Sequence, residues 1–132
     1  MKKEERLEYI KYRMDSAFKT FDAAKILADN CLWNSAVNRL YYAVFYSVNA
    51  LLVQNEIFTE SHSGVRSQFS LHFIKTGKLD KKFGKLLTEL YDWRQKGDYE
   101  NMFDYDEKSV KPLYELVHEM ISTIDKEIKK SI

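Results

Sequence analysis

The chain has 132 residues and a formal net charge of +1, with 45% of its residues hydrophobic and 31% charged. This length fits a single domain, residues 1–132, built around one hydrophobic core. The composition excludes a disordered chain, and no window approaches twenty uncharged apolar residues, which excludes a membrane protein. Because the N-terminus lacks the apolar core of a signal peptide, we expect a cytoplasmic protein.

Two long helices are predicted in the first half of the chain. Apolar residues recur in steps of three and four over residues 7–28, and Asp29-Asn30 marks a break. A second helix over about residues 33–54 is apolar on nearly every side, so we expect it to be the central, buried one. Cys31 lies between the two helices, where we expect a small buried residue at a helix end. As the only cysteine, it excludes an intramolecular disulfide and a thiolate metal cluster.

Two shorter helices are predicted next. Either Ser61 or Ser63 can cap a third helix that ends near Gly77. Asp80 can cap a fourth helix, for which Gly97 is the expected C-terminal stop. The helix junction between them carries five lysines, which either steer phosphate groups or form an ordinary solvated surface. They are Lys75, Lys78, Lys81, Lys82 and Lys85.

The last part of the chain is predicted to be a loop and a fifth helix. Residues 98–106 are acidic and aromatic, which is typical of a connecting loop. Ser109 precedes a fifth helix, and Pro112 falls in its first turn, where no backbone hydrogen bond is lost. The charge is uneven, since residues 1–97 carry +5 and residues 98–132 carry −4. We therefore predict an all-α fold, a five-helix up-and-down antiparallel bundle.

A polar stripe interrupts the apolar second helix. Asn38 and Tyr42 share one face of this helix, and Arg39 lies on an adjacent face. Asparagine gains nothing intrinsically from a helix interior, so its presence points to specific partners. The stripe is either a polar network that fixes the packing of the helices or a ligand-facing site. In either case we expect Arg39 to be largely buried and hydrogen-bonded to polar groups on neighbouring helices. Arg39→Ala should then lower the free energy of unfolding by several kcal/mol.

A second polar group is expected at the end of the fourth helix. Arg94 is placed in the last turn, where the helix dipole favours a cation, and Asp98 is within reach of it. One interpretation is an arginine cap with a salt bridge. The other is a guanidinium directed at a phosphate, with Asp98 or Tyr99 transferring protons and Lys96 adding positive charge. We expect Arg94 to lie near Asn38 or Tyr42.

The sequence predicts neither a metal site nor a cofactor. Glu115 and His118 have the Glu-x-x-His spacing of di-iron bundles, but those sites need a second copy of the motif, which the chain lacks. His72 has no ligand partner nearby in the sequence and is expected to be an ordinary surface residue. His62, flanked by serines before the third helix, is a candidate member of the polar site.

Three segments in this order resemble the HEPN domain, and in particular its small stand-alone prokaryotic members. The segments are Ala-Val-Asn-Arg-Leu-Tyr-Tyr-Ala-Val-Phe at 36–45, Ser-His-Ser-Gly-Val at 61–65, and Arg94 followed by Asp98 and Tyr99. The resemblance implies a five-helix bundle that forms a homodimer. It also implies a nucleotidyltransferase partner, with the two proteins acting as toxin and antitoxin. Many members of the family are metal-independent endoribonucleases.

One departure from the family bears on catalysis. The ribonuclease members carry a histidine four to six residues after the arginine, but here no histidine follows Arg94 until His118. We therefore expect no imidazole near Arg94, and weak or absent cleavage. The first hypothesis is a module that binds RNA or a nucleotide through Asn38, Arg39, Tyr42, His62, Arg94 and Tyr99. The second is a ribonuclease that uses Arg94 with Asp98 or Tyr99, and the third is an interaction scaffold.

Overall fold

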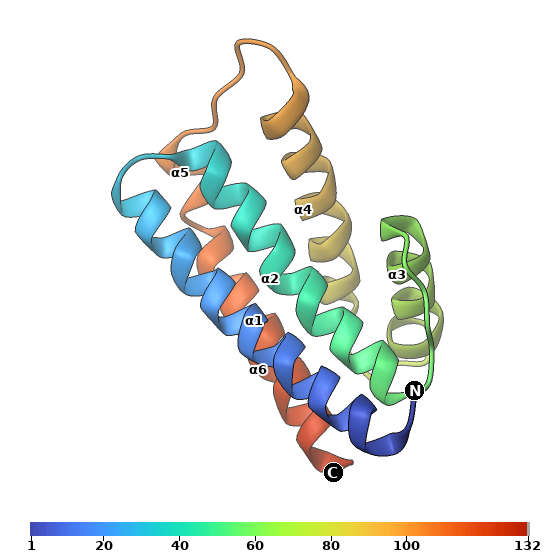
Figure 1. Cartoon of the computed structure of the whole chain (residues 1–132). Helices are drawn as coiled ribbons and strands as arrows, with labels where there is room; N and C mark the ends of the chain where they lie inside the picture. Colours follow the sequence, from blue (N-terminus) through green and yellow to red (C-terminus); the bar gives the residue numbers. More distant parts are fainter. Residues whose placement is uncertain (132) are drawn as a thin grey trace.

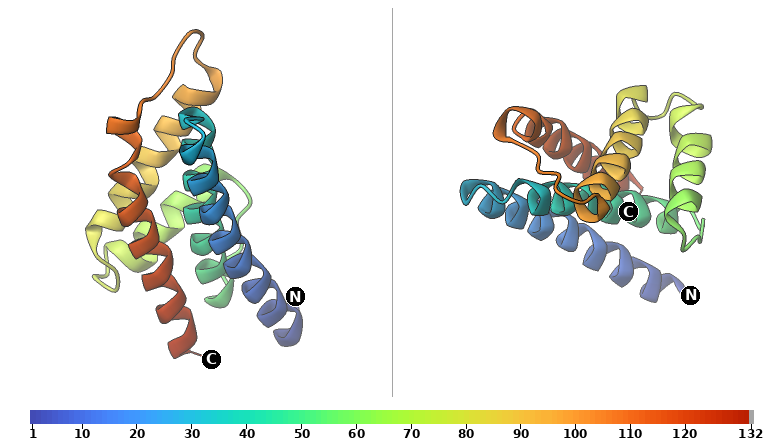
Figure 2. Two further views of the ribbon diagram at one scale, coloured as in Figure 1. Left: turned by 90° about the vertical axis from the view of Figure 1, so that its left-hand side faces the viewer. Right: turned by 90° about the horizontal axis from the view of Figure 1, so that it is seen from above.

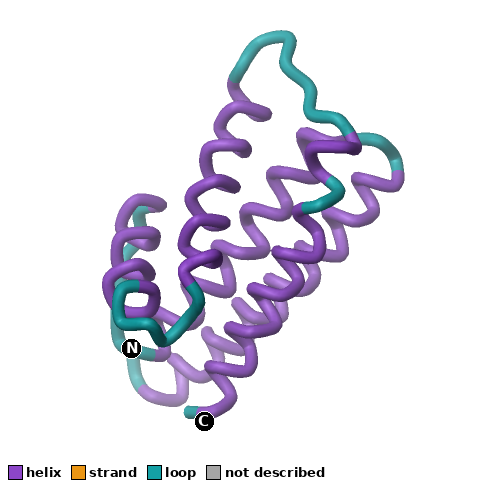
Figure 3. The backbone as a smooth tube through the Cα atoms, turned by 180° about the vertical axis from the view of Figure 1, so that it is seen from behind, coloured by secondary structure: helices purple, strands orange, loops and turns teal. Residues whose placement is uncertain are grey.

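The computed structural model describes residues 1–131, and helices make up most of this part of the chain (Figures 1 and 3). Within residues 1–131 there is no β-strand, so the predicted all-α fold is confirmed. The described elements are α1 (Lys3–Asp29), α2 (Trp33–Gln54), α3 (His62–Phe69), the π-helical turn η1 (Ser70–Ile74), α4 (Lys81–Tyr99), α5 (Glu107–Val110) and α6 (Leu113–Lys130). Because η1 continues α3 and α5 is a single turn, these elements form the five helices expected from the sequence.

Helix α2 is the centre of the bundle, as its apolar character predicts. It packs against α1, α3, α4 and α6, and lies between α1 on one side and α4 with α6 on the other (Figure 2). Its stripe of small residues, Ala36, Ala43 and Ala50, is fully buried and lets neighbouring helices approach closely. None of the helices in residues 1–131 has the length and hydropathy needed to cross a membrane.

Helix α3 departs from the strict alternation of directions. The His62 ring at its start lies 4.8 Å from the Phe45 ring, in the middle of α2. Ile74, at the far end of η1, packs on Gly84 near the start of α4. The segment 55–61 therefore runs back along the bundle, and α3 lies parallel to α2 and antiparallel to α4 (Figure 1). The cap is Ser61, whose Oγ accepts a hydrogen bond from the Gly64 amide at 2.9 Å.

Helix α4 does not stop at Gly97, and this prediction is wrong. The helix continues to Tyr99. The Asn34 side chain donates to the carbonyls of Gly97 and Phe103 at 3.2 and 2.7 Å, and its Oδ1 accepts from the Tyr105 amide at 2.8 Å. These bonds hold the loop after α4 against the start of α2. Glycine is needed at position 97 for another reason, because a Cβ there would lie only 3.3 Å from the Tyr105 ring.

Two further predictions are corrected at the helix ends. The fifth helix divides into α5 and α6, because Asp106 caps α5 by accepting from the Ser109 amide and Pro112 restarts the helix at α6. Cys31 is exposed rather than buried. A Schellman motif ends α1 at this residue. Cys31 has a φ of 60°, its amide donates to the Ala28 carbonyl, and the Leu32 amide donates to the Leu27 carbonyl.

Candidate functional site

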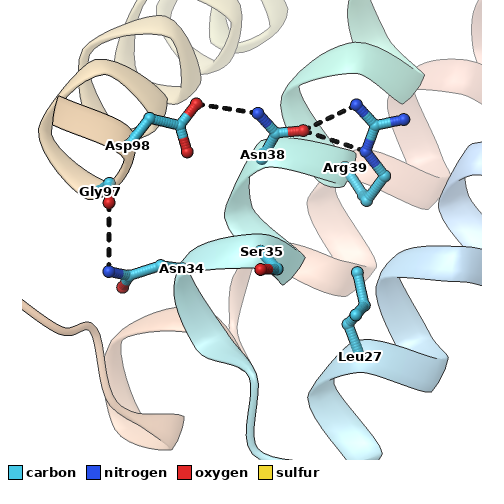
Figure 4. A pocket seen from close by; sticks show the side chains of 7 residues that line it. All are labelled: Leu27, Asn34, Ser35, Asn38, Arg39, Gly97 and Asp98. Atoms are coloured by element: carbon cyan, nitrogen blue, oxygen red, sulfur yellow. Dashed lines mark hydrogen bonds between the residues drawn. The ribbon is translucent and has the colours of Figure 1, made fainter.

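The polar residues of α2 and α4 meet at the surface near the loop end of α4. The Asn38 amide nitrogen donates to the Asp98 carboxylate at 2.9 Å. The Asn38 Oδ1 accepts two hydrogen bonds from the Arg39 guanidinium, at 3.0 and 2.7 Å (Figure 4). One amide thus joins a carboxylate on α4 to a guanidinium on α2. Because α4 continues past Gly97, Asp98 lies one turn beyond Arg94 on the same face.

A pocket of about 550 Å³ opens beside this network. It lies between the end of α1, the first turns of α2 and the end of α4 (Figure 4). The lining residues are Leu27, Asn34, Ser35, Asn38, Arg39, Gly97 and Asp98. Most of the lining groups can donate or accept hydrogen bonds, so the pocket suits a polar ligand.

Arg39 is half-buried, and its bonds stay within its own helix, so the prediction of a largely buried arginine bonded to neighbouring helices is wrong. Its guanidinium carbon lies 5.2 Å from the centre of the Tyr42 ring. The reason is geometric. The buried faces of α2 are filled by small and aliphatic residues and by Tyr41, which leaves Arg39 at the edge of the bundle. There it can contact a ligand without unfolding the helix packing.

Arg94 is the buried arginine of the site, since only 8% of it is exposed. Its Nη1 donates to the Tyr42 hydroxyl at 3.3 Å, which confirms the predicted proximity to Tyr42. Its guanidinium carbon lies 5.3–5.5 Å from three ring centres, those of Tyr41, Tyr42 and Tyr91. The nearest carboxylate, Asp98, is 3.9 Å away. Arg94 is not in the last turn of α4, and its Nε has no hydrogen-bond acceptor within residues 1–131.

An imidazole does lie in this cluster, so the expectation that none stands near Arg94 is wrong. The His62 Nδ1 is 2.6 Å from the Tyr41 hydroxyl, and its ring packs against Tyr41, Tyr42 and Tyr91. Partial burial lowers the pKa of His62, and the positive charges of Arg94 and Arg66 lower it further. Burial raises the pKa of Tyr41. At neutral pH the ring is therefore neutral and able to accept a proton, while the phenol keeps its own.

Two candidate residues lie away from the cluster. Tyr99 is 72% exposed and projects into solvent at the end of α4. The Lys96 Nζ lies 4.4 Å from the centre of the Phe103 ring, on the side of the acidic loop. The structure brings together Asn38, Arg39, Tyr42, His62, Arg94 and Asp98, and leaves Tyr99 and Lys96 outside this group.

Sequence reasoning missed three members of the site. Tyr91 precedes Arg94 by three residues, a spacing that places the two on one helix face and could have identified it. Tyr41, which lies between His62 and Arg94, is part of the 36–45 segment, but the sequence indicated no role of its own for it. Asn34 gave no local signal, because its partners lie more than sixty residues further along the chain.

The site combines a polar stripe on α2, a histidine on α3 and an arginine on α4. The family model of the HEPN domain matches residues 10–128. The chain belongs to the HEPN domain family.

Curated relatives of this HEPN chain come from bacteria and archaea. A "UPF0332 protein" of Thermotoga maritima is 38% identical over 125 residues, which cover 95% of each chain. The "Putative toxin MJ0605" of Methanocaldococcus jannaschii is 35% identical over 108 residues, or 82% of this chain and 81% of the relative. A "UPF0332 protein" of Gloeobacter violaceus is 38% identical over 86 residues, or 65% and 68% of the two chains. This HEPN chain thus matches most of the length of these relatives.

The part of the chain that the structure describes contains no group of three or more His, Cys, Asp or Glu side chains arranged to hold a metal ion. His118 packs instead on the Phe21 ring, with 5.4 Å between the ring centres. The chemistry that the site offers is that of two guanidinium groups, an amide, a carboxylate, phenols and a neutral imidazole. These groups bind anions and can move protons.

Proposed function

We propose that this HEPN domain binds the phosphate groups of RNA or of a nucleotide through Arg39 and Arg94. The observation that carries the proposal is the charge balance around Tyr42. Both guanidinium groups lie within about 5.5 Å of the centre of its ring, whereas among residues 1–131 only one carboxylate, Asp98, is near either of them. A phosphate would supply the missing negative charge and accept hydrogen bonds from both guanidinium groups.

The energetics of Arg94 support this role. A buried guanidinium is costly unless its donors are satisfied, and here one donor has no acceptor among the described residues and the nearest carboxylate is 3.9 Å away. Such an arrangement adds little to stability. It is better explained by a ligand that completes the site than by the bundle geometry alone.

The biological setting is part of the same proposal. Relatives from Methanocaldococcus jannaschii carry the name "Putative toxin", which supports a toxin-like role for this domain. We propose that it acts as a homodimer and is paired with a nucleotidyltransferase-type partner, as the family resemblance implies. Its cytoplasmic location stays a prediction from the sequence.

A binding experiment tests the ligand class. Fluorescence anisotropy with a labelled four-nucleotide oligouridylate should give a dissociation constant that rises with salt, because each phosphate contact releases counterions. Arg39→Gln should weaken binding about tenfold, whereas Arg6→Gln, which removes the same charge at the Glu56 ion pair, should not. Equal affinities for the two variants would refute the role of Arg39. If the wild-type protein does not bind, the scaffold hypothesis is favoured.

A second candidate function, metal-independent RNA cleavage, is favoured by the position of His62. A neutral imidazole near a phosphate-binding arginine can accept the proton of an attacking 2′-hydroxyl. His62 bonds to the Tyr41 hydroxyl, and Arg94 lies 5.3 Å from the centre of the same ring, so Tyr41 joins the candidate proton acceptor to the phosphate-binding arginine. Incubation with labelled RNA in EDTA measures cleavage, and His62→Gln and Asp98→Asn separate the two candidate proton acceptors. Cleavage lost only in Asp98→Asn would restore the carboxylate mechanism expected from the sequence.

A further inference from the structure

A second polar hollow, which we term the basic groove, lies between α3–η1 and α4. It has a volume of about 390 Å³. Its charged and hydroxyl-bearing rim consists of Arg66, Ser70, Lys81, Lys85, Thr88 and one acidic residue, Glu89. Three of these residues, Lys81, Lys85 and Thr88, lie on successive turns of one face of α4. The groove is separate from the pocket beside Asn38 and Arg39, which is lined by other residues.

The segment that forms the groove holds a large excess of positive charge. Residues 66–89 contain six basic and two acidic residues, a net charge of +4, whereas the whole chain has only +1. Lys82 is neutralised by Glu119 on α6, with an Nζ–Oε1 distance of 2.6 Å. Within residues 1–131, no ion pair joins Lys81 or Arg66 to a carboxylate. Lys85 is paired with Glu89 at 3.8 Å, so among the described residues the rim keeps the unpaired charges of Arg66 and Lys81, which attract polyanions.

The groove lies next to the Arg94 site, because Arg66 on its rim and Arg94 contact the same tyrosine ring. The guanidinium of Arg66 lies 4.2 Å from the centre of the Tyr91 ring, and Arg94 lies 5.5 Å from that ring. The face of α4 from Lys81 to Tyr91 spans about 15 Å at the helical rise of 1.5 Å per residue. Positive groups therefore follow one another from the start of α4 to the tyrosine cluster.

The floor of the groove is closely packed, which fixes its shape. A Cβ at Gly84 would lie 3.2 Å from Cγ1 of Ile74, so glycine allows η1 to approach α4. The π-helical turn of η1 forms this contact, and such turns are frequent at functional sites. Phe69 beneath the rim is fully buried. The rim charges are thus held on a rigid support.

We propose that the basic groove holds the sugar–phosphate backbone of a single RNA strand whose end occupies the Arg94 site. The inference rests on the proposed function and extends it, because it predicts a preference for RNA longer than the Arg94 site alone can contact. A continuous concave track of Lys and Arg suits a flexible nucleic-acid strand. A membrane surface would need a broad exposed apolar face beside the charges, whereas Phe69, Phe73 and Leu87 of this region are buried and the exposed Leu71 is a single side chain.

The test compares labelled oligouridylates of four and twelve nucleotides. We expect the wild-type protein to bind the longer RNA at least tenfold more tightly. The double variant Lys81→Gln/Lys85→Gln should lose this gain while binding the four-nucleotide RNA as before. For the longer RNA, the association constant of the double variant should depend less steeply on salt than that of the wild type. The slope of its logarithm against log salt should be smaller in magnitude by about 1.4, since each phosphate contact to a single strand contributes about 0.7. The matched control is Lys11→Gln/Lys19→Gln, which removes two exposed charges from α1, a helix packed on α2 and α6.

The outcomes separate this inference from the proposed function. If Lys81→Gln/Lys85→Gln binds both RNAs like the wild type and like the control variant, the basic groove proposal is wrong. If Arg39→Gln still weakens binding in that case, the proposed phosphate site is retained. If the wild-type protein binds neither RNA, the proposed function fails as well. Binding to phosphatidylserine vesicles instead of RNA, lost in the groove variant, would overturn the proposal in favour of a membrane surface.

Discussion

Replacing Arg94 by methionine separates a structural role for this arginine from a ligand-binding one. Methionine has a similar length, fills the same space on α4 and makes favourable contacts with aromatic rings, but it carries no charge. We expect Arg94→Met to fold with a stability within about 1 kcal/mol of wild type and to lose most of its affinity for RNA. This expectation follows from the contacts of the guanidinium.

The favourable contacts of Arg94 are weak and are offset by its burial. Stacking on tyrosine rings contributes about 1–2 kcal/mol, and the long 3.3 Å bond to Tyr42 about 1 kcal/mol. The 3.9 Å contact with the accessible Asp98 adds about 0.5 kcal/mol at most. Against these stands the unsatisfied Nε, which costs about 1–3 kcal/mol in a residue that is 8% exposed. Exchanging such a buried ion for an apolar residue of similar volume is often neutral or stabilising.

Urea denaturation provides the measurement, with Leu90→Ala as the positive control. Leu90 is fully buried one turn earlier on α4, and its truncation should cost about 2–5 kcal/mol. An Arg94→Met midpoint close to wild type, with an unchanged m-value, would agree with the reasoning. A loss of more than about 2 kcal/mol would refute it, because the arginine would then be part of the core and its link to RNA binding would be indirect.

The remaining predictions concern three positions around the site. Arg39→Ala should cost less than about 1 kcal/mol in urea denaturation, since the residue is half-buried and bonded only to its own neighbour Asn38. The pKa of His62 is lower in the folded protein than in the unfolded chain. As the pH falls, the unfolded chain is therefore protonated at His62 before the folded protein is, and the stability decreases below about pH 6.5. The melting temperature should therefore fall more between pH 7 and pH 5 in wild type than in His62→Gln, and equal changes would contradict the lowered pKa. Gly64→Ala should cost about 1 kcal/mol by thermal melting, because its Cβ would displace the Ser61 cap, and an unchanged melting temperature would contradict this.

The helices could be predicted from the sequence because their signals are local. The 3.6-residue periodicity of 7–28 and the all-round apolar character of α2 gave both elements and the central position of α2. Asp80 was predicted as a cap and acts as one, and of the two serines that could cap α3 the structure uses Ser61. The end of α4, in contrast, depends on contacts with residues far away in the sequence. Asn34 and Tyr105 pack against that glycine from distant parts of the chain, and no property of the α4 sequence predicts these contacts.

The site was predicted in part, for the same reason. The proximity of Arg94 to Tyr42 followed from two polar groups on helices that are otherwise apolar, and the structure confirms it. Which of the two arginines is buried could not be derived, because it depends on where the edge of the bundle falls. His62 was a candidate, yet its place beside Tyr41 depends on α3 running parallel to α2, which loop composition does not reveal.

The direction of α3 has a consequence for the chemistry of the site. The resemblance places the histidine of ribonuclease members four to six residues after the arginine, whereas here the imidazole comes from the start of α3 and bonds to Tyr41. Partial burial lowers the pKa of this imidazole, and the positive charges of Arg94 and Arg66 lower it further. A bound phosphate would offset these two charges and raise the pKa. A bound phosphate would then favour proton transfer to His62. Measuring the pKa of the His62 ring by NMR, with and without the four-nucleotide RNA, should show an upward shift. If the pKa does not move, the imidazole and the phosphate site are not electrostatically linked, and the binding-module hypothesis is favoured over cleavage.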